Sequence, residues 1–501
     1  MGNHAAARTK AQTVRAASGP RRKMNDKRQN AQQGKRAGRS SDPQPQLPST
    51  PGVAGEAQDA AGGRVESFVS PREDQRPTNL LTGEVLPPSV MQEVLQPENL
   101  ETALARVQAN KGSPGIDGMT VKQLPEHLGS HWPQIRQQLL EGTYKPKPVR
   151  RVEIPKPDGG VRKLGIPTVL DRFIQQAVQQ VLTRRWDDTF SQSSFGFRPG
   201  KSAHQAVEAA QRFIADGCSW VVDIDLEKFF DRVNHDRLMG RIMQRENDRA
   251  LIHLIRSFLT AGVMENGLVS PTDEGTPQGG PLSPLLSNLV LDELDKELER
   301  RGHKFVRYAD DCNIYVRSER AGQRVMEGVS DHITRKLKLK VNTSKSAVAR
   351  PRDRKFLSFS FTSGKTAKRR IAPKAIERFK AKVRKLTHRH KGRSLRQMVE
   401  PLGEYLRGWR GYFGHCQTPS VLADLDSWIR RRLRCVVLVH WPRGRRRFAE
   451  LTKRGVGKDL AAQTAASAHG PWRLSRSPAL SYALPNRFWD WLGVERVLPA
   501  G

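Results

Sequence analysis

The pattern of hydrophobic and polar positions changes near residue 85. Before it, polar residues with Pro, Gly and Gln show no hydrophobic period, and the first forty residues hold eleven Lys or Arg against one acid, Asp26. Such a segment buries too little apolar surface to offset its loss of chain entropy. Residues 1–85 are therefore predicted to be a disordered basic arm.

From residue 86 onward, apolar residues recur with regular periods. Residues 95–107 carry leucine and valine at helical spacing, and a further helix is predicted over about 171–186. Residues 150–154 and 161–166 flank the Pro- and Gly-containing stretch 155–160. This arrangement predicts a β-hairpin, because Pro and Gly mark a turn between two strand-like segments.

The centre of the chain alternates strands with helices. Residues 219–226 are dominated by β-branched side chains and predict a strand. Helices are predicted around residues 238–259 and over about 284–301, from the spacing of their apolar positions. Residues 305–316 predict two short strands joined through Ala309–Cys312, which would form a tight hairpin.

The last third of the chain is strongly basic. Residues 365–400 contain fourteen Lys or Arg and two acids, yet an apolar residue still recurs at helical spacing from 376 to 386. This stripe predicts a folded basic helix and not a charged tail. A second basic helix is predicted over about 422–439.

Length and charge limit the class of protein. The chain has 501 residues, 37% of them hydrophobic and 27% charged, which is enough for several packed domains. Its net charge of +35 indicates a polyanionic partner, of which nucleic acid is the commonest; a membrane surface or a ribosome-like particle is the alternative. No stretch approaches the roughly 18 apolar residues of a membrane span, so a soluble chain is expected.

Neither the cysteines nor the N-terminus indicates a secreted protein. The four cysteines are scattered without a paired motif, so neither a disulfide framework nor a zinc site is expected. No apolar secretory signal is present, and the Arg-, Ala- and Ser-rich start resembles an organelle transit peptide only weakly. We therefore expect a bacterial cytoplasmic protein associated with the nucleoid, with organellar targeting as the alternative.

Four carboxylates are candidates for metal chemistry. Asp310 and Asp311 lie at the predicted hairpin tip, and Asp223 and Asp225 lie near the end of the strand predicted before it. Nucleotidyl transfer from a nucleoside triphosphate uses two Mg²⁺ ions roughly 4 Å apart, and Mg²⁺ prefers oxygen ligands. One strand-end carboxylate with an adjacent pair on a hairpin would supply them. An Asp pair in a solvated turn is the alternative that these residues alone leave open.

Several blocks together resemble one family. Tyr308-Ala-Asp-Asp311 resembles the catalytic hairpin of reverse transcriptases. The other blocks follow in the order found in group II intron-encoded reverse transcriptase/maturases, over about residues 90–440. The blocks are Asn110–Gly118 before the fingers, Ile154–Pro167 and Phe195–Gly200 in the fingers, and Asp225–Asp231, Gly275–Pro281, Leu339–Ser346 and Phe356–Phe359 in the palm. The last block reads Leu-Ser-Phe where the family often has Leu-Gly-Phe.

The resemblance implies a fold and a domain order. The fold class is α+β, a right-hand polymerase with fingers and palm followed by an α-helical thumb or maturase domain. The expected domains are the basic extension (1–85), fingers (86–205), palm (206–363), thumb/maturase (364–440) and a candidate DNA-binding segment (441–501).

The family motif also implies residue roles. The catalytic, metal-binding residues would be Asp225, Asp310 and Asp311, with Asp223 structural. The nucleotide pocket would contain Lys156, Arg162, Phe230 and Gln278, where Phe230 would exclude a ribose 2′-OH unless it is an ordinary core residue. The candidate RNA contacts, each weighed against a solvated or packing role, are Arg151, Arg198, Lys201, Lys382, Arg384, Lys385, Arg407, Trp409 and Arg410.

The implied function is an RNA-directed DNA polymerase that copies intron RNA and assists its splicing. It would use two Mg²⁺ ions, dNTPs, an RNA template, a DNA target or primer and the group II intron RNA, and no membrane. No paired-Cys or His-Asn-His cluster follows residue 440, so the compact bacterial type without an endonuclease is expected. The alternatives are a reverse transcriptase of a retron, diversity-generating or CRISPR-associated system, and an RNA-binding splicing factor without polymerase activity.

Overall fold

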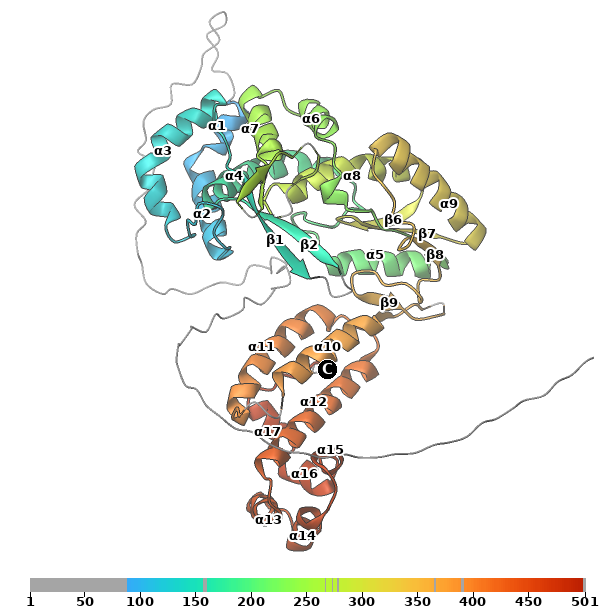
Figure 1. Ribbon diagram of the computed structural model, residues 1–501. Coiled ribbons are helices and arrows are strands. Elements are labelled where there is room, and N and C mark those ends of the chain that lie inside the picture. Colours follow the sequence, from blue (N-terminus) through green and yellow to red (C-terminus); the bar gives the residue numbers. More distant parts are fainter. Residues whose placement is uncertain are drawn as a thin grey trace, which may run out of the picture. The chain divides into compact units, whose positions relative to one another are not determined.

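A computed structural model of the chain describes residues 88–155, 160–265, 267–272, 274–276, 279–364, 366–388 and 392–498. The arm predicted over 1–85 lies outside these residues, as do the candidate site residues Lys156 and Gln278. Figure 1 shows the elements in their order along the chain.

Helices and a small sheet form the first part. The helices are α1 (Val90–Val94), α2 (Pro97–Ala109), α3 (Leu124–Glu141) and α4 (Val169–Trp186). The helical stretch predicted over 95–107 begins only at Pro97, the first residue of α2, because α1 ends at Val94 and Leu95 is its C-cap. The sheet has the order β2-β1-β4-β5, with β1 (Val149–Pro155), β2 (Val161–Ile166), β4 (Val263–Glu265) and β5 (Leu268–Ser270). The antiparallel pairing of β1 with β2 confirms the predicted hairpin.

A second sheet forms the centre, with the order β6-β7-β3-β8. Its strands are β3 (Trp220–Ile224), β6 (Lys304–Tyr308), β7 (Asp311–Val316) and β8 (Ala347–Ala349), and neighbouring strands are antiparallel. The strands predicted over 219–226 and 305–316 are therefore confirmed, with ends that differ by one or two residues. We call this sheet the central sheet.

The central sheet separates two hydrophobic clusters. Side chains alternate between faces along a strand, so Val222 and Ile224 belong to the cluster that includes residues of α4 and α8, whereas Val221 belongs to the cluster that includes residues of α5. Figure 1 shows α8 and α9 on one side of the sheet and α5 on the other. These helices and their neighbours are α5 (Ala203–Ala215), α6 (His235–Met243), α7 (Arg249–Thr260), α8 (Ser283–Arg300) and α9 (Glu319–His332).

The last part is helical. After the short strands β9 (Phe359–Phe361) and β10 (Arg369–Ile371) come α10 (Pro373–Leu386), α11 (Leu395–Phe413) and α12 (Pro419–His440). Shorter helices follow: α13 (Gly444–Lys453), α14 (Lys458–Ala466), α15 (Pro471–Leu474), α16 (Pro478–Ala483) and α17 (Asn486–Trp491). The predicted basic helices over 376–386 and 422–439 correspond to α10 and α12. Phe379, Val383 and Leu433 of these helices pack in the same cluster as Val221 of the central sheet.

The observed architecture confirms the α+β class with a helical C-terminal region. All four cysteines are buried and free, as expected from their scattered positions: Cys218, Cys312, Cys416 and Cys435. Among the described helices, none combines the length and apolar character that a bilayer span requires.

Candidate active site

The predicted catalytic hairpin is the turn between β6 and β7. Tyr308 pairs with Asp311, so Ala309 and Asp310 form a two-residue turn. Ala309 has a φ of +57°, in the left-handed region that residues with a side chain seldom adopt. Because Tyr308 and Asp311 are opposite each other, their side chains leave the sheet on the same face.

Asp225 follows β3 directly and lies beside this hairpin. Its neighbour Ile224 pairs with Cys312, which brings the end of β3 next to Asp311. The backbone N–H of Asp225 donates to Ser346 Oγ at 3.0 Å, and its carbonyl accepts from the Asn342 N–H at 2.8 Å. Lys345 Nζ lies 3.7 Å from Asp225 Oδ2. The block 339–346 therefore holds the backbone of Asp225 and provides a counter-charge to its carboxylate.

The carboxylates act on one another electrostatically. Burial, followed by the negative charges of Asp310, Asp223 and Asp225, raises the pKa of Asp311 to about 7. Burial also raises the pKa of Asp310; the charge of Asp225 adds to this effect and that of Arg162 opposes it.

This electrostatic crowding bears on metal binding. Within the described residues, no three His, Cys, Asp or Glu side chains converge closely enough to surround a metal ion. The carboxylates are nevertheless close enough to raise each other's pKa, and a divalent cation would relieve their mutual repulsion. The all-oxygen donor set of Asp225, Asp310 and Asp311 thus fits a hard divalent metal.

Asp223 has a partner of its own. Arg354 donates two hydrogen bonds to Asp223 Oδ2, from Nε at 2.8 Å and from Nη2 at 2.5 Å. Burial raises the pKa of Asp223, and the charge of Arg354 opposes this rise. A carboxylate occupied in this way is suited to orienting its neighbours, in keeping with the structural role expected for it.

A buried arginine, Arg307, stabilises the β6–β7 turn. The side chains of Arg307 and Asp295 are both 0% exposed, and two hydrogen bonds of 2.7 and 2.6 Å join them. Arg307 Nη1 also donates to the Ala309 carbonyl at 2.9 Å and to Asn288 Oδ1 at 3.0 Å. Because Asp295 and Asn288 belong to α8, Arg307 ties the catalytic turn to that helix.

The structure describes two of the four predicted nucleotide-pocket residues, Arg162 and Phe230. Arg162 is exposed on β2, and its charge acts on Asp310. Phe230 lies in the turn Phe229–Asp231, partly buried against the core, and its carbonyl accepts from Thr276 N–H at 2.7 Å. The turn that carries Phe230 therefore contacts the start of the block Gly275–Pro281.

The same block also approaches the fingers. A Cβ at Gly279, whose φ is +136°, would lie 2.6 Å from the carbonyl oxygen of Gly165 in β2. Only glycine allows this close backbone approach. Thr276 thus contacts the turn that carries Phe230, and Gly279 approaches β2; Gln278 itself is outside the described residues.

Two protein-family models match this chain. Residues 154–361 match the family model "Reverse transcriptase (RNA-dependent DNA polymerase)", and residues 376–455 match "Group II intron, maturase-specific domain". The chain carries a reverse transcriptase domain followed by a group II intron maturase domain. Dependence on divalent metal ions is general for reverse transcriptase domains, and the carboxylates described above are suited to it.

Individual relatives are similar to part of this chain. Protein YkfC of Escherichia coli is 38% identical over 215 residues, which are 42% of this chain and 56% of YkfC. The group II intron-encoded protein LtrA of Lactococcus lactis is 38% identical over 222 residues, 43% of this chain and 36% of LtrA. The chain thus spans little more than half of one relative and about a third of the other. A solved chain of the partial Cas6-RT-Cas1–Cas2 complex is 28% identical, with a TM-score of 0.33, over 50% of this chain and 43% of that one.

Two predicted RNA contacts are buried, which favours the packing role for them. Arg198 of the reverse transcriptase domain is buried, and its guanidinium donates to the Asp187 side chain and to the Ser191 and Ser194 carbonyls. Trp409 of the maturase domain is also buried, and its ring centre lies 4.4 Å from that of Phe379 and 4.6 Å from that of Phe413. Both side chains pack within the fold and are less than 10% exposed.

The other predicted RNA contacts are exposed or partly exposed. In the reverse transcriptase domain, Arg151 Nε lies 3.8 Å from Glu265 Oε2, and Lys201 Nζ donates to Gln192 Oε1. In the maturase domain, Arg407 and Arg410 share Glu495. The remaining three belong to α10, where Arg384 and Lys385 are exposed and Lys382 is partly exposed.

The structure adds a cationic cluster that we did not predict from the sequence. Lys380, Arg384 and Arg432 lie over the Trp428 ring at 5.9, 5.6 and 5.5 Å from its centre. We call these four residues the Trp428 cluster. Their spacing along α10 and α12 was visible in the sequence, but which faces of the two helices meet was not.

Arg307 and Arg354 were also missed. The sequence signal for Arg307 was its place inside the apolar strand Phe305–Tyr308, where a charge needs a buried partner. Arg354 carried no comparable signal, because its partner Asp223 is distant in the sequence.

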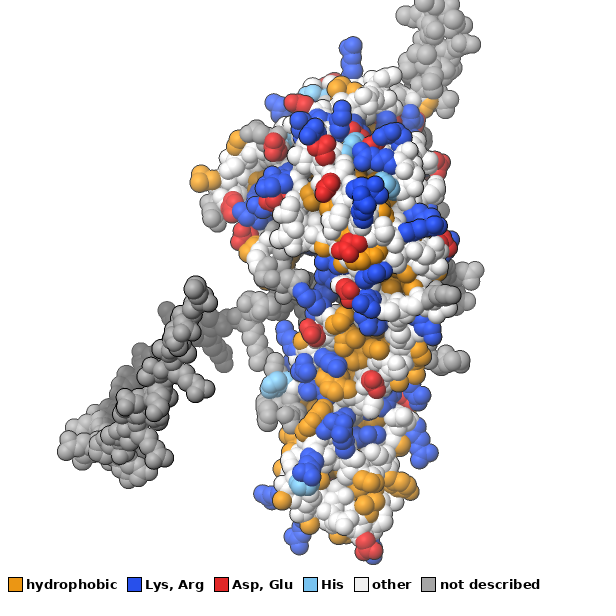
Figure 2. All heavy atoms as spheres, turned by 90° about the vertical axis from the view of Figure 1, so that its right-hand side faces the viewer, with side chains coloured by type: hydrophobic (Ala, Val, Ile, Leu, Met, Phe, Trp, Pro, Cys, Tyr) orange, Lys and Arg blue, Asp and Glu red, His pale blue; other side chains and the backbone are white. Residues whose placement is uncertain are grey.

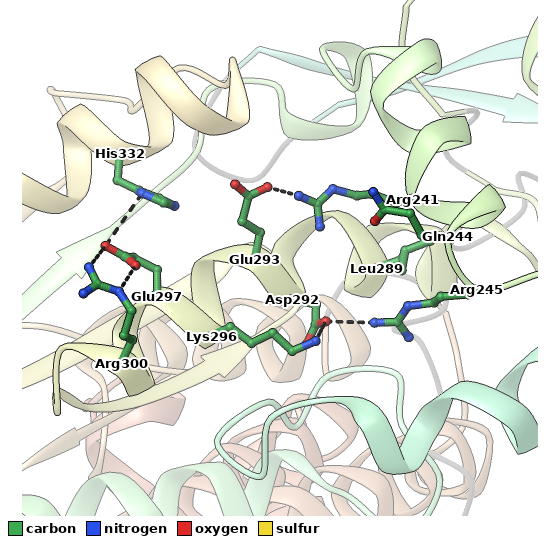
Figure 3. Close-up of a pocket in the computed structure, with 10 residues that line it drawn as sticks. All are labelled: Arg241, Gln244, Arg245, Leu289, Asp292, Glu293, Lys296, Glu297, Arg300 and His332. Carbon is green, nitrogen blue, oxygen red and sulfur yellow. Dashed lines mark hydrogen bonds and ion pairs between the residues drawn. The ribbon is translucent and has the colours of Figure 1, made fainter.

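A separate pocket of about 410 Å³ lies between α6, α8 and the end of α9 (Figure 3). Acids and bases alternate along its wall: Asp292 pairs with Arg245 and Lys296, and Glu297 pairs with Arg300. None of the predicted site residues lines it. Each of its lysine and arginine side chains is paired with a carboxylate.

Proposed function

We propose that this chain is an RNA-directed DNA polymerase that copies group II intron RNA into DNA and assists the splicing of that RNA. The observation that carries the polymerase activity is the meeting of Asp225, at the end of β3, with Asp310 and Asp311 on the β6–β7 turn. The metal would be Mg²⁺, as two ions held by these three carboxylates.

The described residues suit the reaction of a primer 3′-OH with a dNTP. Bound Mg²⁺ would supply charge neutralisation for the attacking and leaving oxygens. Arg162, together with Lys156, would hold the triphosphate and offset its negative charge. Phe230, fixed by the hydrogen bond from Thr276 to its carbonyl, would pack against the sugar and exclude a 2′-OH. Gln278 would line the nucleotide pocket, and Gly279 permits the close approach of this block to β2.

The splicing role rests on the maturase domain and its charge. Figure 2 shows one face of the protein, on which Lys and Arg side chains are more numerous than acidic ones. The Trp428 cluster combines three cations with an aromatic ring, the combination that suits both phosphate contact and base stacking. Intron RNA is the partner we propose for this surface, with Lys382, Arg384 and Lys385 of α10 among the contacts.

The polymerase proposal is tested by extension of a DNA primer on an RNA template in Mg²⁺. The wild-type protein is expected to extend the primer, and the Asp310→Ala/Asp311→Ala variant is expected to lose extension while still binding intron RNA. Asp331→Ala, which removes an exposed carboxylate from α9, is the matched control and should extend normally. Substantial extension by the double variant would exclude these carboxylates as the catalytic ones.

The splicing proposal is tested separately, by the salt dependence of intron RNA binding. Each phosphate contact contributes a log–log slope of about −0.7 to −0.9. Neutralising Lys382, Arg384 and Lys385 should flatten this slope and impair splicing more than extension on a generic template. If extension collapses while splicing assistance is unchanged, α10 serves the polymerase alone.

A further inference from the structure

An exposed aromatic residue lies beside the catalytic turn and has no role in the function proposed so far. Phe197 is 48% exposed, although it belongs to the loop Phe195–Gly200, whose neighbouring side chains Phe195 and Arg198 are buried. Its ring centre lies 6.3 Å from that of Tyr308. Exposure of a large aromatic ring costs the folded chain burial energy, so the position of Phe197 calls for an explanation.

The loop is fixed on both sides of Phe197. On one side, Gly196 fits so closely that a Cβ there would collide with the backbone N of Ala309 and lie 3.0 Å from the carbonyl carbon of Tyr308. The Gly196 carbonyl accepts from Asn288 Nδ2 at 2.9 Å. On the other side, the guanidinium of Arg198 is tied to Asp187 and to two backbone carbonyls. Phe197 therefore projects from a rigid support and not from a flexible loop.

The backbone of Phe197 is strained. Its φ of +59° lies in the left-handed region, which is a genuine outlier for a bulky residue. Glycine would adopt this φ freely, and a left-handed residue with a side chain persists where its surroundings over-determine it, which happens often at binding sites. The chain thus combines a strained backbone with an exposed ring at a point where a glycine without a side chain would satisfy the turn.

The ring lies on the face of the central sheet that carries the catalytic carboxylates. Tyr308 pairs with Asp311, and both side chains leave the sheet on one face. Phe197 is next to Tyr308 on that face, since Phe195 of the same loop packs in the cluster that contains Val221 and Val306. A nucleic acid whose terminus is at Asp310 and Asp311 would therefore meet the Phe197 ring.

We propose that Phe197 contacts the primer–template duplex, with its ring packed against the nucleotide beside the primer terminus. This inference rests on the proposed polymerase function and adds a contact to it. A ring packs against any base or sugar, so the contact is independent of sequence. The hydrogen-bonded loop holds the ring in place before the duplex binds, which lowers the entropy lost on binding.

The test compares full-length variants in two measurements: anisotropy of a labelled primer–template duplex without dNTP, and the KM for that duplex in extension. Phe197→Ala is expected to raise both the Kd and the KM about tenfold, the size of one lost stacking contact. Phe197→Tyr should restore both values. Phe197→Gly should lose affinity like Phe197→Ala yet melt at a higher temperature, because glycine relieves the strained φ.

Two control variants separate the contact from general effects. Lys338→Gly relieves a left-handed φ of +56° at an exposed position, and Met243→Ala removes an exposed apolar side chain from the end of α6. Both should bind and extend the duplex like the wild type. If the wild type extends normally and Phe197→Ala matches it within about twofold, this inference fails alone. If the wild type neither binds nor extends the duplex, the polymerase proposal fails with it.

Discussion

Removal of one charge beneath the catalytic turn should destabilise the protein severely. Asp295→Asn keeps the shape of the side chain but leaves the Arg307 guanidinium, which is 0% exposed, without its carboxylate. Breaking a buried pair by removing one partner costs about 3–5 kcal/mol, because the remaining charge stays buried without compensation. A domain is stable by only about 5–15 kcal/mol in total, so this single change would remove a large part of the stability.

The expected result is a fall in melting temperature of about 10 °C, at the 2–4 °C per kcal/mol typical of a domain of this size. The assay is thermal unfolding followed by circular dichroism. Asp331→Asn is the matched control, since it breaks the exposed pair with Arg335, and such pairs contribute about 0–1 kcal/mol. Equal melting temperatures for the two variants would refute the reasoning.

A double substitution separates stability from positioning. Asp295→Leu with Arg307→Met removes both charges together, and such replacements are often neutral or stabilising. The double variant should therefore recover most of the lost stability. It still lacks the hydrogen bond from Arg307 to the Ala309 carbonyl, so its kcat for primer extension should remain below that of the wild type. Recovery of both stability and kcat would show that Arg307 has a purely structural role.

Three further changes test other contacts. Gly196→Ala should abolish primer extension while the protein still binds intron RNA, because the added Cβ would displace the backbone of Ala309. Ser358→Gly should raise the stability by about 1 kcal/mol, as seen in thermal unfolding, since Ser358 has a φ of +66°; Ser358→Ala should give no such gain. Trp428→Ala should weaken intron RNA binding about tenfold without changing the salt slope of that binding, because a stacking ring is lost and no charge is removed.

The sequence was sufficient where local pattern determines structure. The β-branched run before Asp225 predicted β3, which ends directly before that residue. The apolar residues spaced through the basic stretch predicted α10, because a helix with one apolar stripe can be covered with charges elsewhere. In these cases each residue's role follows from its near neighbours along the chain.

The sequence was insufficient where a role depends on distant partners. Arg198 and Trp409 are the residue types that bind RNA, but Asp187 and the Ser191 carbonyl occupy the first, and Phe379 buries the second. Neither burial follows from composition, because it depends on how the chain folds back on itself. The Trp428 cluster was missed for the same reason, since it forms only where α10 meets α12.

The hydrophobic cluster shared by the two domains also limits how this protein can be divided. Phe359 of the reverse transcriptase domain belongs to one cluster with Leu402 and Leu406 of the maturase domain, and its ring centre lies 5.6 and 5.4 Å from those of Tyr412 and Phe413. A protein cut after residue 363 would lack these α11 side chains and would expose apolar surface around Phe359 that is prone to aggregation. Expression, fusion or transfer to another host should therefore use both domains together, even where polymerisation is the only activity wanted.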